Sequence, residues 1–210
     1  MTITEEKNRE EKTSSGPSMT NISIALVVIL VGLAVIVGMN SSSGSSSSSV
    51  NSPAPLAAAT PTHVSVPSIS ADSNLVATGL QSDGSLEVPP VSQPMQAAWF
   101  NGSPTPGEVG PAVILGHVNG GGQPGIFAKL NEVVAGAQIL VDRADGQRAV
   151  FQVSRVDTIP KASFPTDQVY NDTPNSQLRL ITCGGDYDRA NRNYLSNVIV
   201  YADLVDVQRI

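Results

Sequence analysis

The chain has 210 residues, with 12 basic and 18 acidic side chains and a formal net charge of −6 at neutral pH. No lysine or arginine cluster occurs in its last two thirds, which argues against nucleic acid as a partner. Only 4% of the residues are aromatic, and short apolar runs are separated by glycine and proline. This pattern favours an all-β domain over a helical one.

The first 39 residues predict a membrane anchor. Residues 1–21 are charged and polar, which is typical of a disordered cytoplasmic tail. Residues 22–39 form an apolar run of 18 positions without a charge, just long enough to cross a bilayer as a helix. Lys7, Arg9 and Lys12 precede this run, and no basic residue follows it until Lys129. The asymmetry predicts a single-pass protein of the cell membrane, with a cytoplasmic N-terminus and an extracellular remainder.

A cleaved secretory signal is the alternative interpretation of the same apolar run. The run is long for that purpose, and no small-residue site ending in alanine follows closely behind it, so we expect an uncleaved anchor. Residues 40–61 are rich in serine and then in proline and alanine, which predicts a flexible, disordered stalk. Residues 62–210 remain as one globular domain.

Short apolar runs bounded by turn residues continue through this domain. We expect about eight strands, which predict a closed or nearly closed β-barrel, with a β-sandwich as the alternative. One short helix is expected at 125–130. The expected strands span 63–67, 74–78, 86–88, 112–118, 138–142, 147–156, 178–183 and 197–205.

Cys183 is the only cysteine of the chain and closes the apolar run that begins at Leu178. Gly184 and Gly185 follow it and allow another chain to approach the backbone closely. Exported proteins normally pair their cysteines, so an unpaired thiol at a strand end indicates a nucleophile. The alternative is an inert, buried cysteine that packs as a small apolar side chain.

A thiol nucleophile needs a base, and the chain has two histidines. His63 lies at the stalk boundary, where a packing or surface role is expected. His117 ends an apolar run and is followed by Asn119 and three glycines, a loop with room for a peptide. Two strands of one barrel can bring His117 and Cys183 to the same rim, although a structural histidine remains the alternative.

Covalent acyl transfer also needs a group that stabilises the oxyanion of the tetrahedral intermediate. Arg189 and Arg192 follow the Cys183 strand, and either guanidinium could fold back over the thiol and favour its thiolate form. The alternative is that both arginines are solvated and pair with Asp186 and Asp188.

These features together resemble a sortase, a cysteine transpeptidase of Gram-positive bacteria. The resemblance covers about residues 62–206 and rests on an N-terminal anchor, a stalk, Leu-Gly-His at 115–117, Leu-Ile-Thr-Cys at 180–183 and an arginine nine residues later. The Thr-Cys-Gly-Gly run at 182–185 and the segment 124–130 are most similar to class E and class F sortases of actinobacteria.

The resemblance implies an eight-stranded barrel with one or two short helices. It implies Cys183 as the nucleophile, His117 as the general acid and base, and Arg192 as the stabiliser of the oxyanion and the substrate. Arg189 stays an alternative, because the arginine of the family usually begins the last strand, where Asn197 stands here. The expected substrate-binding residues are Asn119, Thr182, Gly184 and Gly185.

The implied substrate is a secreted protein with a C-terminal sorting signal similar to Leu-Pro-x-Thr-Gly. The implied acceptor is an amine of a peptidoglycan precursor or a pilin lysine, reached through a thioacyl enzyme. We expect no cofactor and no metal, because the sequence has no histidine and cysteine spacing typical of a metal site.

Three other functions were weighed against this one. An L,D-transpeptidase is expected to carry histidine and glycine just before the cysteine, where this chain has isoleucine and threonine. A papain-like hydrolase normally places its cysteine before its histidine, which is the reverse of the order here. A non-catalytic, membrane-tethered β-barrel for binding or adhesion is the alternative outside the enzymes.

Overall fold

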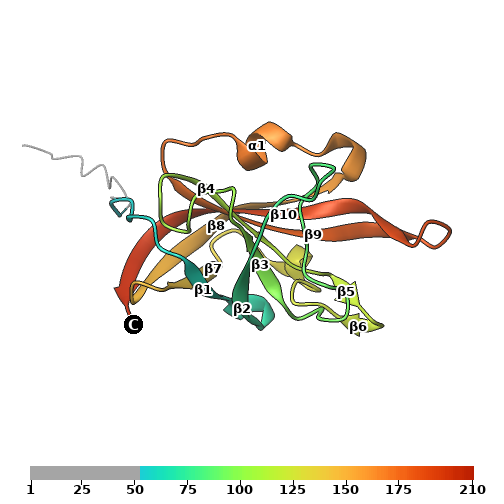
Figure 1. Cartoon of the computed structure of the whole chain (residues 1–210), viewed down its shortest axis with the longest axis horizontal. Helices are drawn as coiled ribbons and strands as arrows, with labels where there is room; N and C mark the ends of the chain where they lie inside the picture. Colours follow the sequence, from blue (N-terminus) through green and yellow to red (C-terminus); the bar gives the residue numbers. More distant parts are fainter. Residues whose placement is uncertain (1–52) are drawn as a thin grey trace, which may run out of the picture. The chain divides into compact units, whose positions relative to one another are not determined.

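The computed structural model describes residues 53–210, which form ten strands, one short α-helix and three 3₁₀ turns (Figure 1). The tail and anchor predicted for residues 1–39 lie outside the described residues, and no helix within 53–210 has the length and apolarity to cross a membrane. The strands are β1 (Pro61–Val66), β2 (Ala71–Thr78), β3 (Ala97–Phe100), β4 (Gly110–Leu115), β5 (Asn119–Gly120), β6 (Gln123–Pro124), β7 (Gln138–Arg143), β8 (Gln147–Pro160), β9 (Ser176–Asp188) and β10 (Asn193–Arg209). The helical turns are η1 (Pro67–Ile69), η2 (Leu130–Glu132), η3 (Lys161–Ser163) and α1 (Thr166–Tyr170).

Eight of these strands close into a barrel in the order β1-β2-β3-β4-β9-β10-β8-β7, and β5 and β6 form a separate hairpin. The predicted all-β, eight-stranded barrel is therefore confirmed. Most neighbours are antiparallel, but β4 and β9 run parallel, as do β2 and β3. The parallel β4–β9 pair matters most for function, because β4 ends at a rim of the barrel beside the point where β9 crosses that rim and continues to Asp188.

Two sequence-based element predictions are wrong. Residues 86–88 are not a strand of the barrel, because Leu86 makes only an isolated bridge to Leu80 within an irregular loop. Residues 125–130 form turns and not a helix, and the 3₁₀ turn η2 begins only at Leu130. Strand β3, which was not among the expected strands, completes the eight strands of the barrel and pairs with both β2 and β4.

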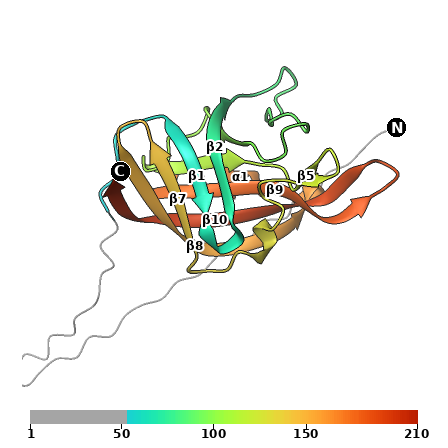
Figure 2. The same ribbon diagram turned by 90° about the horizontal axis from the view of Figure 1, so that it is seen from below.

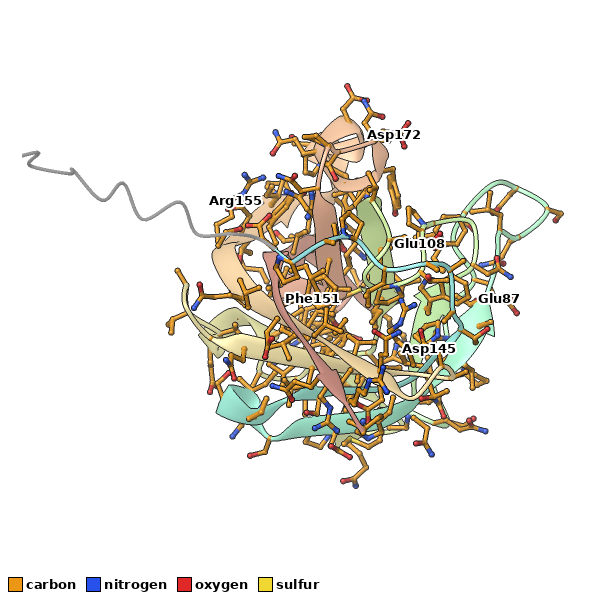
Figure 3. All side chains as sticks on the ribbon, turned by 90° about the vertical axis from the view of Figure 1, so that its left-hand side faces the viewer. Glu87, Glu108, Asp145, Phe151, Arg155 and Asp172 are labelled. Atoms are coloured by element: carbon orange, nitrogen blue, oxygen red, sulfur yellow. The ribbon has the colours of Figure 1, made fainter. Side chains whose placement is uncertain are left out.

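The central strands are covered on both faces, which explains their continuous apolar sequences. Leu178 and Leu180 of β9 point into the barrel, where Phe151 also lies (Figure 3). Ile181 points outward into a second apolar cluster with Leu115 of β4 and Val169 of α1. The α1 segment thus covers the outer face of β4, β9 and β10, as Figure 1 shows.

The stalk ends earlier than the sequence indicated, because residues 53–60 lie against the barrel. The Leu56 backbone N–H donates to the Gly107 carbonyl oxygen at 2.8 Å. The buried guanidinium of Arg143 donates to the carbonyl oxygen of Ala57 at 2.5 Å and also to that of Pro106. The prediction of a disordered stalk over residues 40–61 is therefore wrong for residues 53–60. Their hydrogen-bond partners lie far away in the sequence, and the amino-acid composition of the segment does not reveal them.

Strands β9 and β10 continue past the barrel as a long hairpin (Figures 1 and 2). Their tips are joined at Asp188 and Asn193, which pair with each other, and the ring of Tyr187 packs edge-on against Tyr194 with centroids 5.0 Å apart. The hairpin places residues 189–192 at the end of an extension and not over the rim where β4 ends.

Candidate active site

The register of β4 and β9 brings the predicted base and nucleophile together. Leu115 pairs with Ile181, and the Gly116 N–H donates to the Ile181 carbonyl oxygen at 3.2 Å. His117 and Cys183 each follow two residues after that pair, so they occupy equivalent positions of two parallel neighbours. Side chains two residues apart in a strand share a face, so both leave the rim on the outer side of the barrel.

Both side chains line one cavity of about 720 Å³ on this outer face. Its floor is formed by the end of β4 and by residues within β9 and β10, and its walls come from the β2–β3 loop and from the segment between β8 and β9. Most of the lining side chains are apolar, which fits a ligand that buries apolar side chains next to the thiol. They are Leu80, Leu86, Val88, Phe100, Leu115, Phe164, Tyr170 and Ile181.

His117 is half-buried, and one ring nitrogen is held in place. Its Nε2 lies 2.6 Å from the carbonyl oxygen of Pro89. A carbonyl oxygen only accepts hydrogen bonds, so Nε2 carries the hydrogen and Nδ1 of the neutral ring remains the nitrogen that can take a proton. Gly125 packs against the backbone of His117. A Cβ on Gly125 would lie 2.6 Å from the His117 carbonyl carbon and 3.0 Å from the Cβ of His117.

The free thiol of Cys183 is half-buried and also borders a second cavity of about 300 Å³. Gly184 and Gly185 line this cavity, and neither has room for a side chain. A Cβ on Gly184 would lie 2.6 Å from Val198 Cγ2, and Gly185 has a positive φ of 71°. The glycines accommodate an irregularity in the β9–β10 pairing beside the thiol, and they open a space next to it.

A sequence model of the sortase domain matches residues 64–205, which is more than half of the chain. The chain belongs to the sortase family. Cys183 is its single cysteine, and the protein is a sortase, that is, a cysteine transpeptidase. A search of curated proteins finds no match.

Solved sortase structures share the fold of this sortase at low identity. The SrtA sortase from Actinomyces oris is 19% identical with a TM-score of 0.55, and the match covers 76% of this chain and 89% of that one. Sortase A from Listeria monocytogenes is 15% identical with a TM-score of 0.54, over 73% and 92% of the two chains. A lid mutant of sortase A from Corynebacterium diphtheriae is 19% identical with a TM-score of 0.54, over 74% and 72%.

The residues predicted to bind substrate fall into two groups in this sortase. Thr182 lines both cavities, and its buried Oγ1 has no hydrogen-bond partner among the described residues. Gly184 and Gly185 line the smaller cavity. Asn119 lines neither and instead donates through Nδ2 to the Tyr194 hydroxyl at 2.6 Å, which ties the β5–β6 hairpin to β10.

The two predicted arginines do not reach the thiol. Asn197, and not an arginine, pairs with Cys183 across the β9–β10 ladder and lines the large cavity. Arg192 precedes Asn197 by five residues, which is about 16 Å along an extended strand. Arg189 and Arg192 are both exposed at the hairpin tip and line neither cavity. In this structure neither arginine lies over Cys183.

Lys161 was not predicted as a site residue, yet it lines the large cavity together with Cys183 and His117. It follows directly after Pro160, which pairs with Ser196 of β10. Burial raises the pKa of the Tyr170 hydroxyl above its usual value, so this phenol is neutral at physiological pH. Within residues 53–210, no group of three acidic, histidine or cysteine side chains is placed to hold a metal ion.

Proposed function

We propose that this sortase cleaves a C-terminal sorting signal similar to Leu-Pro-x-Thr-Gly and joins the released protein to a cell-wall or pilin amine. The observation that carries this proposal is the equivalent placement of His117 and Cys183, each two residues beyond the Leu115–Ile181 pair of two parallel strands. Their shared cavity is lined mainly by apolar side chains, as binding of the leucine and proline of such a signal requires.

The proposed reaction has two acyl transfers. The Cys183 thiolate attacks the threonine carbonyl carbon, and the C–N bond to glycine breaks as protonated His117 donates a proton to the leaving amine. The product is a thioester between the enzyme and the surface protein. An incoming amine then attacks the thioester carbonyl carbon and loses a proton to His117, and the C–S bond breaks to release the thiolate of Cys183.

The hydrogen bond from Nε2 to Pro89 supports these roles for His117. It orients the ring, and it leaves Nδ1 free to exchange the proton with the amine in both steps. The smaller cavity on the other side of Cys183 includes Asn131 and Tyr194. It offers space for the leaving glycine and for the incoming amine, next to the same sulfur atom.

The predicted anchor at residues 22–39 supports a location at the outer face of the cell membrane. A secreted substrate and a lipid-linked acceptor both begin at that surface, so a tethered transpeptidase meets both. The similarity of residues 182–185 to class E and class F sortases remains a prediction that substrate preference can test.

The test is incubation of the full-length protein with a library of sorting-signal peptides and triglycine as acceptor, followed by mass spectrometry. We expect cleavage between threonine and glycine, a triglycine adduct and loss of both in Cys183→Ala. Activity of Cys183→Ala equal to that of the wild type would exclude the mechanism. Absence of any cleaved peptide in the wild type would exclude this class of substrate.

A further inference from the structure

A polar cavity lies on the outer face of the barrel, beside α1. It has a volume of about 350 Å³ and shares no lining residue with the two cavities that Cys183 borders. Its lining side chains are polar or aromatic and come from β8, α1, β9 and β10: Ser154, Arg155, Gln168, Gln177, Arg179 and Tyr201. Two of these six residues are arginines, and none is a carboxylate. The cavity therefore differs in chemistry from the apolar cavity of the proposed active site.

Cross-strand pairing places both arginines against one tyrosine. Tyr201 of β10 pairs with Arg155 of β8 on one side and with Arg179 of β9 on the other. The guanidinium carbon of Arg155 lies 3.7 Å from the centre of the Tyr201 ring, and that of Arg179 lies 4.6 Å from it. Because the face of an aromatic ring attracts cations, Tyr201 holds two like charges close together.

An irregularity in β8 gives Arg155 this position. Tyr201 and Ala202 are adjacent in β10, yet their partners in β8 are Arg155 and Val153. Ser154 is therefore an extra residue, and its Oγ donates to the Tyr201 carbonyl oxygen at 3.1 Å. Without this bulge, alternation along the strand would point Arg155 into the barrel core, where Val153 lies. With it, Arg155 lies at the outside of the barrel (Figure 3).

Arg179 is a buried cation whose hydrogen-bond partners are neutral. Only 4% of its surface is exposed. Its guanidinium donates to the carbonyl oxygens of Gln168 at 3.3 Å and Leu178 at 3.2 Å. It also donates to Oε1 of Gln177 at 2.5 Å, and the amide nitrogen of Gln177 donates in turn to Asp203 at 2.8 Å. No carboxylate within residues 53–210 lies within 4.0 Å of Arg179 itself.

Charge and hydrogen bonding are both incomplete in this cavity. Burial lowers the pKa of Arg179 below its usual value, and the nearby charge of Arg155 acts in the same direction. Arg155 is half exposed and pairs with Asp157 at 3.0 Å, so the charge of Arg179 is the one that lacks a direct counterion. The Tyr201 hydroxyl is buried, and none of the residues that the structure describes forms a hydrogen bond with it. A buried charge or hydroxyl without a partner costs free energy, which a ligand with several acceptor atoms would offset.

We propose that this cavity binds the phosphate group of a ligand. Arg155, Arg179 and the Tyr201 hydroxyl supply donors from three side chains, and a phosphate group has three strongly accepting oxygen atoms, whereas a carboxylate has two. The half-exposed side chain of Arg155 turns toward the phosphate and uncovers the hydroxyl beneath it. The phosphate belongs to a soluble ligand or to a lipid headgroup, and the test separates these sources.

Three variants test the donors one at a time. Arg155→Gln removes the more exposed charge, and Tyr201→Phe removes only the unpartnered hydroxyl. Arg179→Lys keeps the buried charge but loses the planar fork of the guanidinium. Arg209→Gln is the control, because it removes a charge from an exposed position of β10 that lines none of the three cavities.

The first measurement is isothermal titration of the full-length protein with inorganic phosphate at neutral pH and constant ionic strength. We expect saturable binding to the wild type and to Arg209→Gln with equal affinity. Binding should be at least about fivefold weaker in Arg155→Gln and Arg179→Lys, and at least about threefold weaker in Tyr201→Phe. Acetate should bind the wild type more weakly than phosphate. Absence of saturable phosphate binding, equal affinity in all variants, or tighter binding of acetate would overturn the proposal.

Thermal unfolding shows whether the variants fold. Without phosphate, Tyr201→Phe should be at least as stable as the wild type, because the hydroxyl that it removes has no partner. Phosphate should nevertheless raise the Tm of Tyr201→Phe less than that of the wild type. An equal rise in both proteins would contradict the role of the hydroxyl as a phosphate donor.

The second titration identifies the source of the phosphate. Dihexanoyl phosphatidic acid, kept below its micelle concentration, replaces inorganic phosphate. Binding at least about tenfold tighter than that of inorganic phosphate supports a lipid headgroup as the ligand, and equal affinity supports a soluble phosphate. Failure of this lipid to compete with inorganic phosphate would exclude the headgroup. None of these measurements uses a sorting peptide, so their outcome is independent of the proposed function.

Discussion

Replacement of Gly125 by alanine tests how strictly the loop after β4 positions His117, the proposed general acid and base. Gly125 is buried, and its backbone N–H donates to the Val118 carbonyl oxygen at 2.9 Å. An alanine Cβ would lie 2.6 Å from the carbonyl carbon of His117 and closer still to its carbonyl oxygen. Both are backbone atoms, so no side-chain rotation relieves the overlap.

The size of the effect follows from these contacts. Ordinary contacts of a Cβ begin near 3.4 Å, so the His117 backbone must move by about 0.8 Å or more. Overpacking of this kind typically costs about 1–3 kcal/mol of stability. A displacement of about 1 Å at a catalytic group can lower the rate roughly 100-fold. We therefore expect Gly125→Ala to lose far more activity than stability.

The assay compares Gly125→Ala with Gly79→Ala, for which a new Cβ meets only Asn101 Oδ1 at 3.7 Å. Thermal unfolding measures stability, transpeptidation measures kcat/KM, and alkylation by iodoacetamide measures access to Cys183. Gly79→Ala should resemble the wild type in all three. A Gly125→Ala protein with wild-type kcat/KM would refute the claim that this close approach fixes the position of His117.

Three further predictions concern stability and the hairpin. Arg148 donates a hydrogen bond of 2.5 Å to Asp142 and thereby holds the pKa of this carboxyl below its usual value of 3.8. The pair therefore stabilises the folded state above pH 3.8. This stabilisation is lost as the pH falls through the lower pKa of Asp142 in the folded protein. In urea titrations, Asp142→Asn should be about 1 kcal/mol less stable than the wild type at pH 7 and equally stable near pH 2. The same loss of stability at both pH values would show that the Arg148–Asp142 pair is not its cause. Arg143→Met should release residues 53–60 and make them susceptible to limited proteolysis, and unchanged protection would show that other contacts hold the segment. Arg189→Ala and Arg192→Ala should each retain kcat/KM within about twofold, whereas a tenfold loss in either would return an arginine to the active site.

The placement of His117 and Cys183 in one cavity was predictable from the sequence, because both follow buried apolar strand segments. The apolar runs that end near His117 and Cys183 indicate where the two strands reach the rim of the barrel, although β4 stops at Leu115 and β9 continues to Asp188. The register itself, Leu115 with Ile181, is a pairing between distant segments that no local pattern encodes. The proximity of His117 and Cys183 was predicted instead from the need of a thiol nucleophile for a nearby base.

The position of Arg192 could not be predicted from the sequence, because it depends on the length of a hairpin. Nine residues separate Cys183 from Arg192, but the strands stay paired to Asp188 and Asn193 and carry the arginine away from the rim. No local sequence pattern marks Lys161 as a residue of the cavity, because the cavity is assembled from segments that lie far apart in the sequence.

The boundary of the stalk was missed for a related reason. The proline- and alanine-rich composition of residues 53–60 predicts a flexible chain, and only long-range hydrogen bonds oppose that tendency. The bond from Arg143 to the Ala57 carbonyl spans 86 residues of sequence. A buried arginine in β7 gives no indication in the sequence that its partners lie before β1.

The central claim is that Cys183 and His117 act on one bound peptide. The most direct test is intact-protein mass spectrometry of the full-length enzyme after rapid quenching with a sorting-signal peptide and no acceptor amine. We expect a mass increase equal to the peptide fragment that ends in threonine, located on Cys183 and strongly reduced in His117→Ala. An adduct that forms at the same rate in His117→Ala, or a cleaved peptide with no adduct on Cys183, would contradict it.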